Sequence, residues 1–250
     1  MSHQLKPIVF AMDDSASTAD RRLVLADIVE QAVHDGAKAI VLDIYFKSET
    51  PSDARLRQTL LAAKNAGISV FAVAPFDNLD SYNIFNNCGS TPFEETVIMG
   101  HNLARTNDEP GEIPNPTRMN NYEESHCGRG YYSVPLLVAG KLRGWPTQLG
   151  MEQGKPSDLE LGLMDNHYRD LTGADKPPLH SYKDHTNIDL KGAVVFIGGT
   201  VASISGAPVD VVMDDTGKQS YGVYDVVSAT MAYYSRIADP TEFVISPAKK

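Results

Sequence analysis

Oxygen-bearing side chains follow the first apolar segment of this chain. Asp13, Ser15 and Ser17 come directly after Pro7–Met12, with the spacing Asp-x-Ser-x-Ser. Carboxylate and hydroxyl oxygens are the ligands that hard divalent cations such as Mg²⁺ and Mn²⁺ prefer. The same side chains are also good caps for the backbone N–H groups that begin a helix. Cation binding and helix capping therefore both stay open for this cluster.

Two more polar groups follow apolar segments further along the chain. Asp43 lies near the end of AIVLDI, and Thr200 follows Gly198 and Gly199 at the end of AVVFIGG. The carboxyl ends of parallel strands meet at one edge of a sheet, where α/β proteins bind ligands. We therefore expect these groups to meet Asp13, where they could bind a cation or a polar metabolite or form a buried hydrogen-bond network. The favoured alternative is that Asp13 and Asp43 cap the helix and loop that follow them.

The glycine pair allows the backbone to approach another backbone or a ligand closely. Gly198-Gly199-Thr200 lacks the spacing of known phosphate-binding loops, so a tight structural turn is favoured over an anion site. The candidate ligand-binding residues are Asp13, Ser15, Asp43, His101, Gly198, Gly199 and Thr200.

No catalytic residue, metal centre or cofactor is predicted from this sequence. The other histidines are scattered without zinc-ligand spacing, and no Gly-x-Ser-x-Gly motif is present. Cys88 and Cys127 are too few for a disulfide scaffold. Their spacing alone leaves a single disulfide and two separate thiols equally open.

Residues 7–75 are predicted to form a β-α-β-α-β unit. Its strands are Pro7–Met12, Ala39–Ile44 and Ile68–Ala74, and its helices are Arg21–Val33 and a segment that begins near Thr50. Gly36 and Gly67 are placed to end the two helices. Right-handed crossovers predict that the three strands are parallel and neighbouring.

Residues 190–240 are predicted to close the sheet. Ala193–Ile197 is a continuous apolar run between glycines, typical of a strand buried on both faces. A short strand over Pro208–Met213 and a helix over Val223–Ile237 follow. The prediction is an α/β fold, with a mostly parallel sheet, helices on both faces and one domain over residues 1–250.

Residues 76–189 are rich in Asn, Gly, Pro and Ser and are predicted to be a long loop-rich insertion. Within it, Glu95–His101 and Tyr131–Val138 are candidate strands, and Leu159–Leu171 is a candidate helix.

The charge of the chain excludes some classes of partner. The 250 residues carry a formal net charge of -10, so nucleic acids and anionic membrane surfaces are not expected partners. No apolar run is long enough for a membrane-spanning helix, and no signal peptide is recognised at the start. These features are typical of a cytosolic protein or of a soluble part of a larger one.

Three segments together resemble the type-2 CHASE domain, an extracellular sensory module of bacterial adenylate cyclases, histidine kinases and related receptors. They are IVFAMDDSAS, GAKAIVLDIYFKSETPSDARLRQTLLAAKNAGISVFAV and DLKGAVVFIGGTVASISGAPVDV with the helix that follows. Gly100-His101, Asn107–Glu109 with Gly111, and YYSVPLL more loosely resemble the middle of that family. This resemblance is why His101 is a candidate site residue, and a histidine there could report external pH.

The resemblance implies a periplasmic or extracellular ligand-sensing domain that is not an enzyme by itself. It further implies flanking transmembrane helices and a separate output domain, a small-molecule or protein ligand, and a possible homodimer. An oxidising compartment would favour a disulfide between Cys88 and Cys127.

Two alternatives remain. Asp13-x-Ser15-x-Ser17 is similar to the metal-binding motif of von Willebrand A-type domains, which would make the chain a metal-dependent binding module. A cytosolic α/β hydrolase acting at the strand ends is the other.

Overall fold

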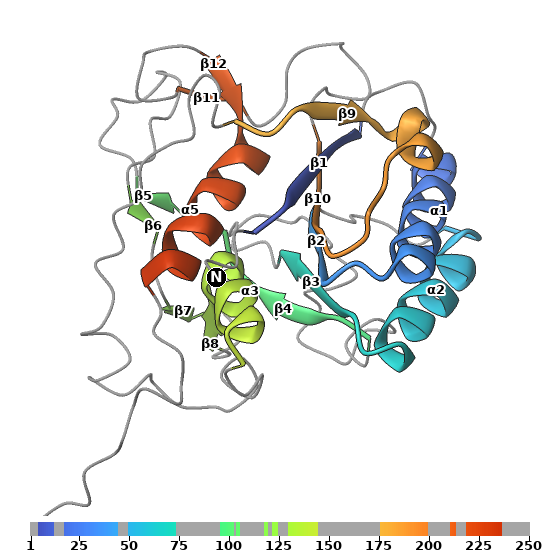
Figure 1. Ribbon diagram of the computed structural model, residues 1–250, viewed down its shortest axis with the longest axis horizontal. Helices are drawn as coiled ribbons and strands as arrows, with labels where there is room; N and C mark the ends of the chain where they lie inside the picture. The colour runs from blue at the N-terminus through green and yellow to red at the C-terminus, as the bar shows by residue number, and fades with distance from the viewer. Residues whose placement is uncertain are drawn as a thin grey trace, which may run out of the picture.

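A computed structural model gives the arrangement of the chain (Figure 1). The residues that it describes are 5–12, 18–44, 50–73, 96–102, 104–105, 118–119, 122–124, 130–144, 176–199, 211–213 and 219–236. At its centre lies one sheet of six strands that all run parallel, in the order β4-β3-β2-β10-β1-β9. The strands are β1 (Pro7–Met12), β2 (Ala39–Asp43), β3 (Ser69–Val73), β4 (Ile98–Gly100), β9 (Leu179–Ser181) and β10 (Val194–Gly199).

The late strand β10 lies between β1 and β2. Val194 is opposite both Pro7 of β1 and Ala39 of β2. The prediction that this strand joins the sheet of the amino-terminal unit is confirmed, but the prediction that β1 and β2 are neighbours is wrong. Both faces of a central strand are covered by helices, and the uninterrupted apolar run of β10 suits that position.

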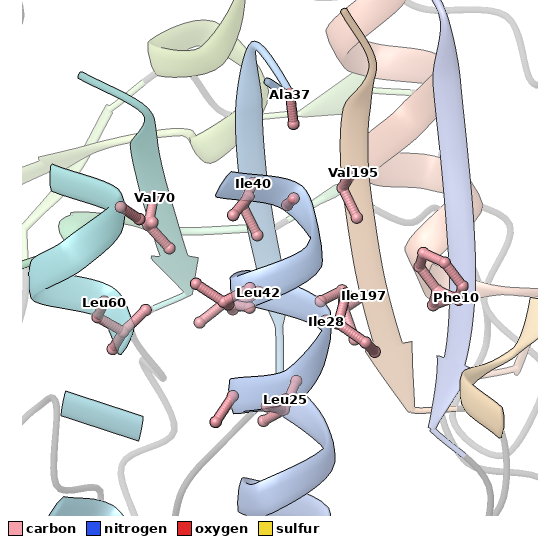
Figure 2. Packing of buried hydrophobic residues seen from close by; sticks show 14 of the residues in the cluster. Phe10, Leu25, Ile28, Ala37, Ile40, Leu42, Leu60, Val70, Val195 and Ile197 are labelled. Carbon is pink, nitrogen blue, oxygen red and sulfur yellow. The ribbon is translucent and has the colours of Figure 1, made fainter. Parts of the chain in front are cut away.

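Helices cover both faces of the sheet, as predicted (Figure 1). One face is covered by α1 (Thr18–Asp35), α2 (Asp53–Asn65) and the 3₁₀ helix η3 (Tyr182–Asn187), and the other by α3 (Val134–Leu142) and α5 (Gly222–Arg236). Alternate residues of β10 point to the two cores: Val195 and Ile197 to the first, Val194 and Phe196 to the second. Figure 2 shows the first core, where Leu25 and Ile28 of α1 meet the sheet.

The two helices of the amino-terminal unit begin and end near the predicted residues. Asp53 accepts a hydrogen bond from the backbone N–H of Thr50 at 2.9 Å, which satisfies a donor before the first turn of α2. Gly36 and Gly67 follow α1 and α2 with φ of 75° and 78°, a conformation that suits glycine and ends a helix.

The middle tract contributes more to the sheet than an insertion would. Both edge strands, β4 and β9, and helix α3 come from residues 76–189. The predicted strand over Tyr131–Val138 is wrong beyond its start, because β8 (Gly130–Tyr132) ends there and α3 begins at Val134. Pro135 suits a first helical turn, where its missing N–H is not needed. The candidate helix Leu159–Leu171 lies outside the described residues.

Three two-stranded antiparallel sheets complete the described secondary structure. They pair β5 (Ala104–Arg105) with β6 (Arg118–Met119), β7 (Tyr122–Glu124) with β8, and β11 (Val211–Met213) with β12 (Gln219–Tyr221).

Across the part of the chain that the structure describes, no helix is both long enough and apolar enough to span a membrane.

Candidate ligand-binding edge of the sheet

The predicted site lies at the carboxyl edge of the sheet, which is the edge where the parallel strands end. Asp43, the last residue of β2, is opposite Gly198 of β10, and Gly199 is opposite Met12, the last residue of β1. The prediction that these strand ends share one edge is therefore confirmed. The other predicted site residues, Asp13, Ser15, Ser17 and Thr200, and the cysteines Cys88 and Cys127, lie outside the described residues.

A hydrogen bond crosses this edge from β4 to β2. Asn102, just after β4, donates from Nδ2 to Oδ1 of Asp43 at 2.9 Å, although β3 lies between the two strands. Asp43 is largely buried, with 9% of its surface exposed. Its carboxylate is thus held as an oriented acceptor in a region of low dielectric constant, where hydrogen bonds are strong. Sequence reasoning did not identify Asn102; its position at a strand end was the available signal.

His101 is fully buried, with 0% of its surface exposed. Its backbone N–H donates to the carbonyl of Tyr132 at 3.1 Å, and its carbonyl accepts from the N–H of Val134 at 2.8 Å. These bonds attach the end of β4 to the start of α3. The residue lies beside Asn102 at the predicted edge, but its side chain is inside the protein.

Gly198 provides a close approach between β10 and α5. A Cβ atom at this position would lie 2.5 Å from Cβ of Val223, in the first turn of α5. The same construction at Gly199 meets no atom within 4 Å. The expectation that a glycine here lets the chain pack closely is confirmed for Gly198, and it places the start of α5 directly against the carboxyl end of β10.

A buried ion pair joins the second turn of α1 to the first turn of α2 on the other face of the sheet. Nε of Arg22 contacts Oδ1 of Asp53, and the Arg22 side chain is 1% exposed. Burial lowers the pKa of Arg22, which Asp53 counteracts by charge attraction and a hydrogen bond. Sequence reasoning placed Asp53 at a helix start but missed its partner, because nothing in the local pattern marks Arg22 as buried.

The first turn of α5 is also attached to the start of β9. The hydroxyl of Tyr224 donates to the carbonyl of Pro177 at 2.8 Å, and burial raises the pKa of Tyr224 to about 12. Nζ of Lys176 donates to Oγ of Ser220 at 2.5 Å and lies 4.4 Å from the centre of the Tyr224 ring.

The helices α3 and α5 both begin at the carboxyl edge and end together at the opposite edge. Arg143, just after α3, donates from Nε and Nη2 to the carbonyl of Tyr234 in the last turn of α5, at 2.9 and 2.6 Å. Its guanidinium carbon lies 4.0 Å from the centre of the Tyr234 ring. Carbonyls in the last turn of a helix generally lack partners within that helix, and Arg143 supplies donors to the carbonyl of Tyr234 from outside.

The chemistry at this edge suits a small polar ligand. Asp43 and Asn102, hydrogen-bonded to each other, place a carboxylate and an amide next to the ends of β2, β10 and β1. Within the described ranges, no group of three or more His, Cys, Asp and Glu residues is close enough to hold a metal ion.

Comparisons with protein-family models, with curated proteins and with solved structures found no match for this chain.

Proposed function

We propose that this chain is a ligand-sensing domain, without catalytic activity of its own, from a bacterial transmembrane receptor of the cyclase or histidine kinase type. In this proposal a small polar ligand binds outside the cytoplasm at the carboxyl edge of the sheet. The segments that resemble the type-2 CHASE domain support it, because they form the adjacent strands β1, β10, β2 and β3 together with α2.

The observation that carries the proposal is the position of α5. Its first turn packs against Gly198 at the candidate site, and its last turn is held by Arg143 at the opposite edge. A ligand that changes the receptor must bind two conformations with different affinity. One helix of 15 residues, in contact with the site at one end, is suited to carry that difference to the segment that follows it.

The proposal is tested by thermal unfolding of the chain with a panel of polar metabolites and divalent cations. We expect at least one compound to raise the Tm of the natural chain but not of the Asp43→Asn variant. Asp189→Asn is the matched control, because it makes the same chemical change at the opposite edge, and it should respond like the natural chain. A compound that stabilises all three proteins equally, or that is chemically converted, would contradict the proposal.

A further inference from the structure

The edge where the strands begin, here called the amino edge, carries a group of exposed lysines. Lys6 precedes β1, Lys38 precedes β2 and Lys191 lies shortly before β10. Lys64 and Lys141 lie in the last turns of α2 and α3, which run back to this edge. All five side chains belong to exposed residues.

Backbone contacts place three of these lysines side by side. The N–H of Lys38 donates to the carbonyl of Ala193 at 2.7 Å, and the carbonyl of Lys6 accepts from the N–H of Val194 at 3.0 Å. Lys6 also reaches the carbonyl of Lys191 with its Nζ atom at 3.4 Å. The lysines that precede β1, β10 and β2 therefore form one continuous row across the sheet.

Few opposite charges accompany this row. Among the residues that the structure describes, the aspartates at this edge are Asp35 and Asp189. Asp189 pairs with Lys6 at 3.3 Å, while Asp35 accepts hydrogen bonds from Gln31 and from the backbone N–H of Leu190. Among the described residues, positive side chains therefore outnumber negative ones at this edge, although the chain as a whole carries a formal net charge of -10.

The first described strand begins at this same edge, and the last described helix ends there. The chain enters β1 at Pro7, and α5 ends at Arg236 after running back from the carboxyl edge. In a receptor of the proposed kind, segments that continue from both points into a bilayer would hold the amino edge against the lipid surface. This step rests on the proposed function, whereas the charge distribution does not.

We propose that the amino edge docks on the anionic headgroups of the membrane. Each lysine near an anionic lipid surface raises the affinity about fivefold, and this attraction decays over a distance of about one Debye length from the surface. Docking would place the candidate ligand site at the opposite edge of the sheet, away from the bilayer and open to solutes. The negative net charge of the chain predicted that anionic membranes would not bind it. Net charge does not show how unevenly the charges are distributed over the surface.

The test is sedimentation of the chain with vesicles at low salt. Binding to phosphatidylcholine vesicles that contain phosphatidylglycerol is expected, and binding to pure phosphatidylcholine is not. The double variant Lys38→Glu and Lys191→Glu should bind at least about 25-fold more weakly, because it loses two lysines worth about fivefold each and adds two repelled carboxylates. The control Arg57→Glu and Lys183→Glu reverses two exposed charges away from the row and should bind like the natural chain.

Equal loss in both double variants, or no binding by the natural chain, would overturn the proposal. Binding of heparin through Lys38 and Lys191 without binding to phosphatidylglycerol vesicles would also overturn it, in favour of a soluble polyanion. The Asp43→Asn variant should still bind vesicles. Failure of membrane docking is thus seen in vesicle sedimentation, whereas failure of ligand sensing is seen in thermal unfolding.

Discussion

Gly198 allows β10 and α5 to approach each other, and the effect of filling that space is predictable. Gly198→Ala places a methyl carbon against Val223 and should lower the free energy of unfolding by about 1–3 kcal/mol. Gly199→Ala meets open space and should leave stability nearly unchanged. Denaturant unfolding of both variants measures the difference.

A double-mutant cycle identifies the contact as the cause. Adding Val223→Gly to Gly198→Ala removes the Cβ atom that makes the closest contact, so the double variant should be more stable than the sum of the two single changes predicts. If the two changes in the free energy of unfolding were strictly additive, the contact between position 198 and α5 would not be the reason why alanine is unfavourable there.

Asp35 should make stability depend on pH in the acid range. Its pKa is lowered first by the hydrogen bond with His34, and also by those with Gln31 and the N–H of Leu190. A carboxylate with a lowered pKa stabilises the fold above its unfolded pKa of about 3.9, and that contribution is lost as pH falls through the folded value.

Asp35→Asn should therefore lower the free energy of unfolding by about 1 kcal/mol at neutral pH. The difference in free energy of unfolding between the variant and the natural chain should become smaller below about pH 4. Unfolding curves of the two proteins across this range make the comparison. A gap that stays constant to the lowest pH would contradict the assignment.

At the scale of single residues, the sequence correctly predicted the positions of residues that lie at the ends of strands. Asp43 and Gly198 were placed correctly, because parallel strands bring their ends to one edge. Asn102 and Arg22 were missed, since each acts through a partner distant in sequence. The local sequence around a residue does not show which distant side chain will contact it in the folded protein.

At the scale of elements, α3 and α5 run side by side from the carboxyl edge to the amino edge of the sheet. Arg143→Ala removes both hydrogen bonds to the last turn of α5 and the contact with the Tyr234 ring. It should cost about 2 kcal/mol of stability and speed amide exchange in that turn. Lys141→Ala, an exposed change two residues away, is the control and should have little effect.

Arg143→Lys separates charge from geometry in the same contact. It keeps a cation near the end of α5 but loses the forked donors, so its effect should be close to that of alanine. Full retention of stability in the lysine variant would show that charge alone is sufficient there.

Element type was predictable where the apolar period was clear, and failed where it was not. Every residue from Val134 to Gly140 is buried, so neither a helical nor a strand period is visible in that segment. In contrast, α2 buries only Leu56, Thr59, Leu60 and Ala63 on one face, and its helical spacing was recognised.

At the scale of the whole molecule, the two edges of one sheet have different chemistry. The carboxyl edge holds Asp43 and Asn102, and the amino edge holds the row of exposed lysines. The sequence predicted a parallel α/β sheet but not its strand order. Order depends on which apolar strand takes the central position, and β10 enters between strands that are consecutive in the chain.

Ligand binding at the carboxyl edge is expected to be transmitted along α5. Hydrogen–deuterium exchange, with and without a compound that stabilises the natural chain, tests this claim most directly. We predict that exchange changes at residues 101–102 and along α5 as far as its last turn, and that Asp43→Asn abolishes both changes. A change confined to the edge, with α5 unaltered, would contradict it.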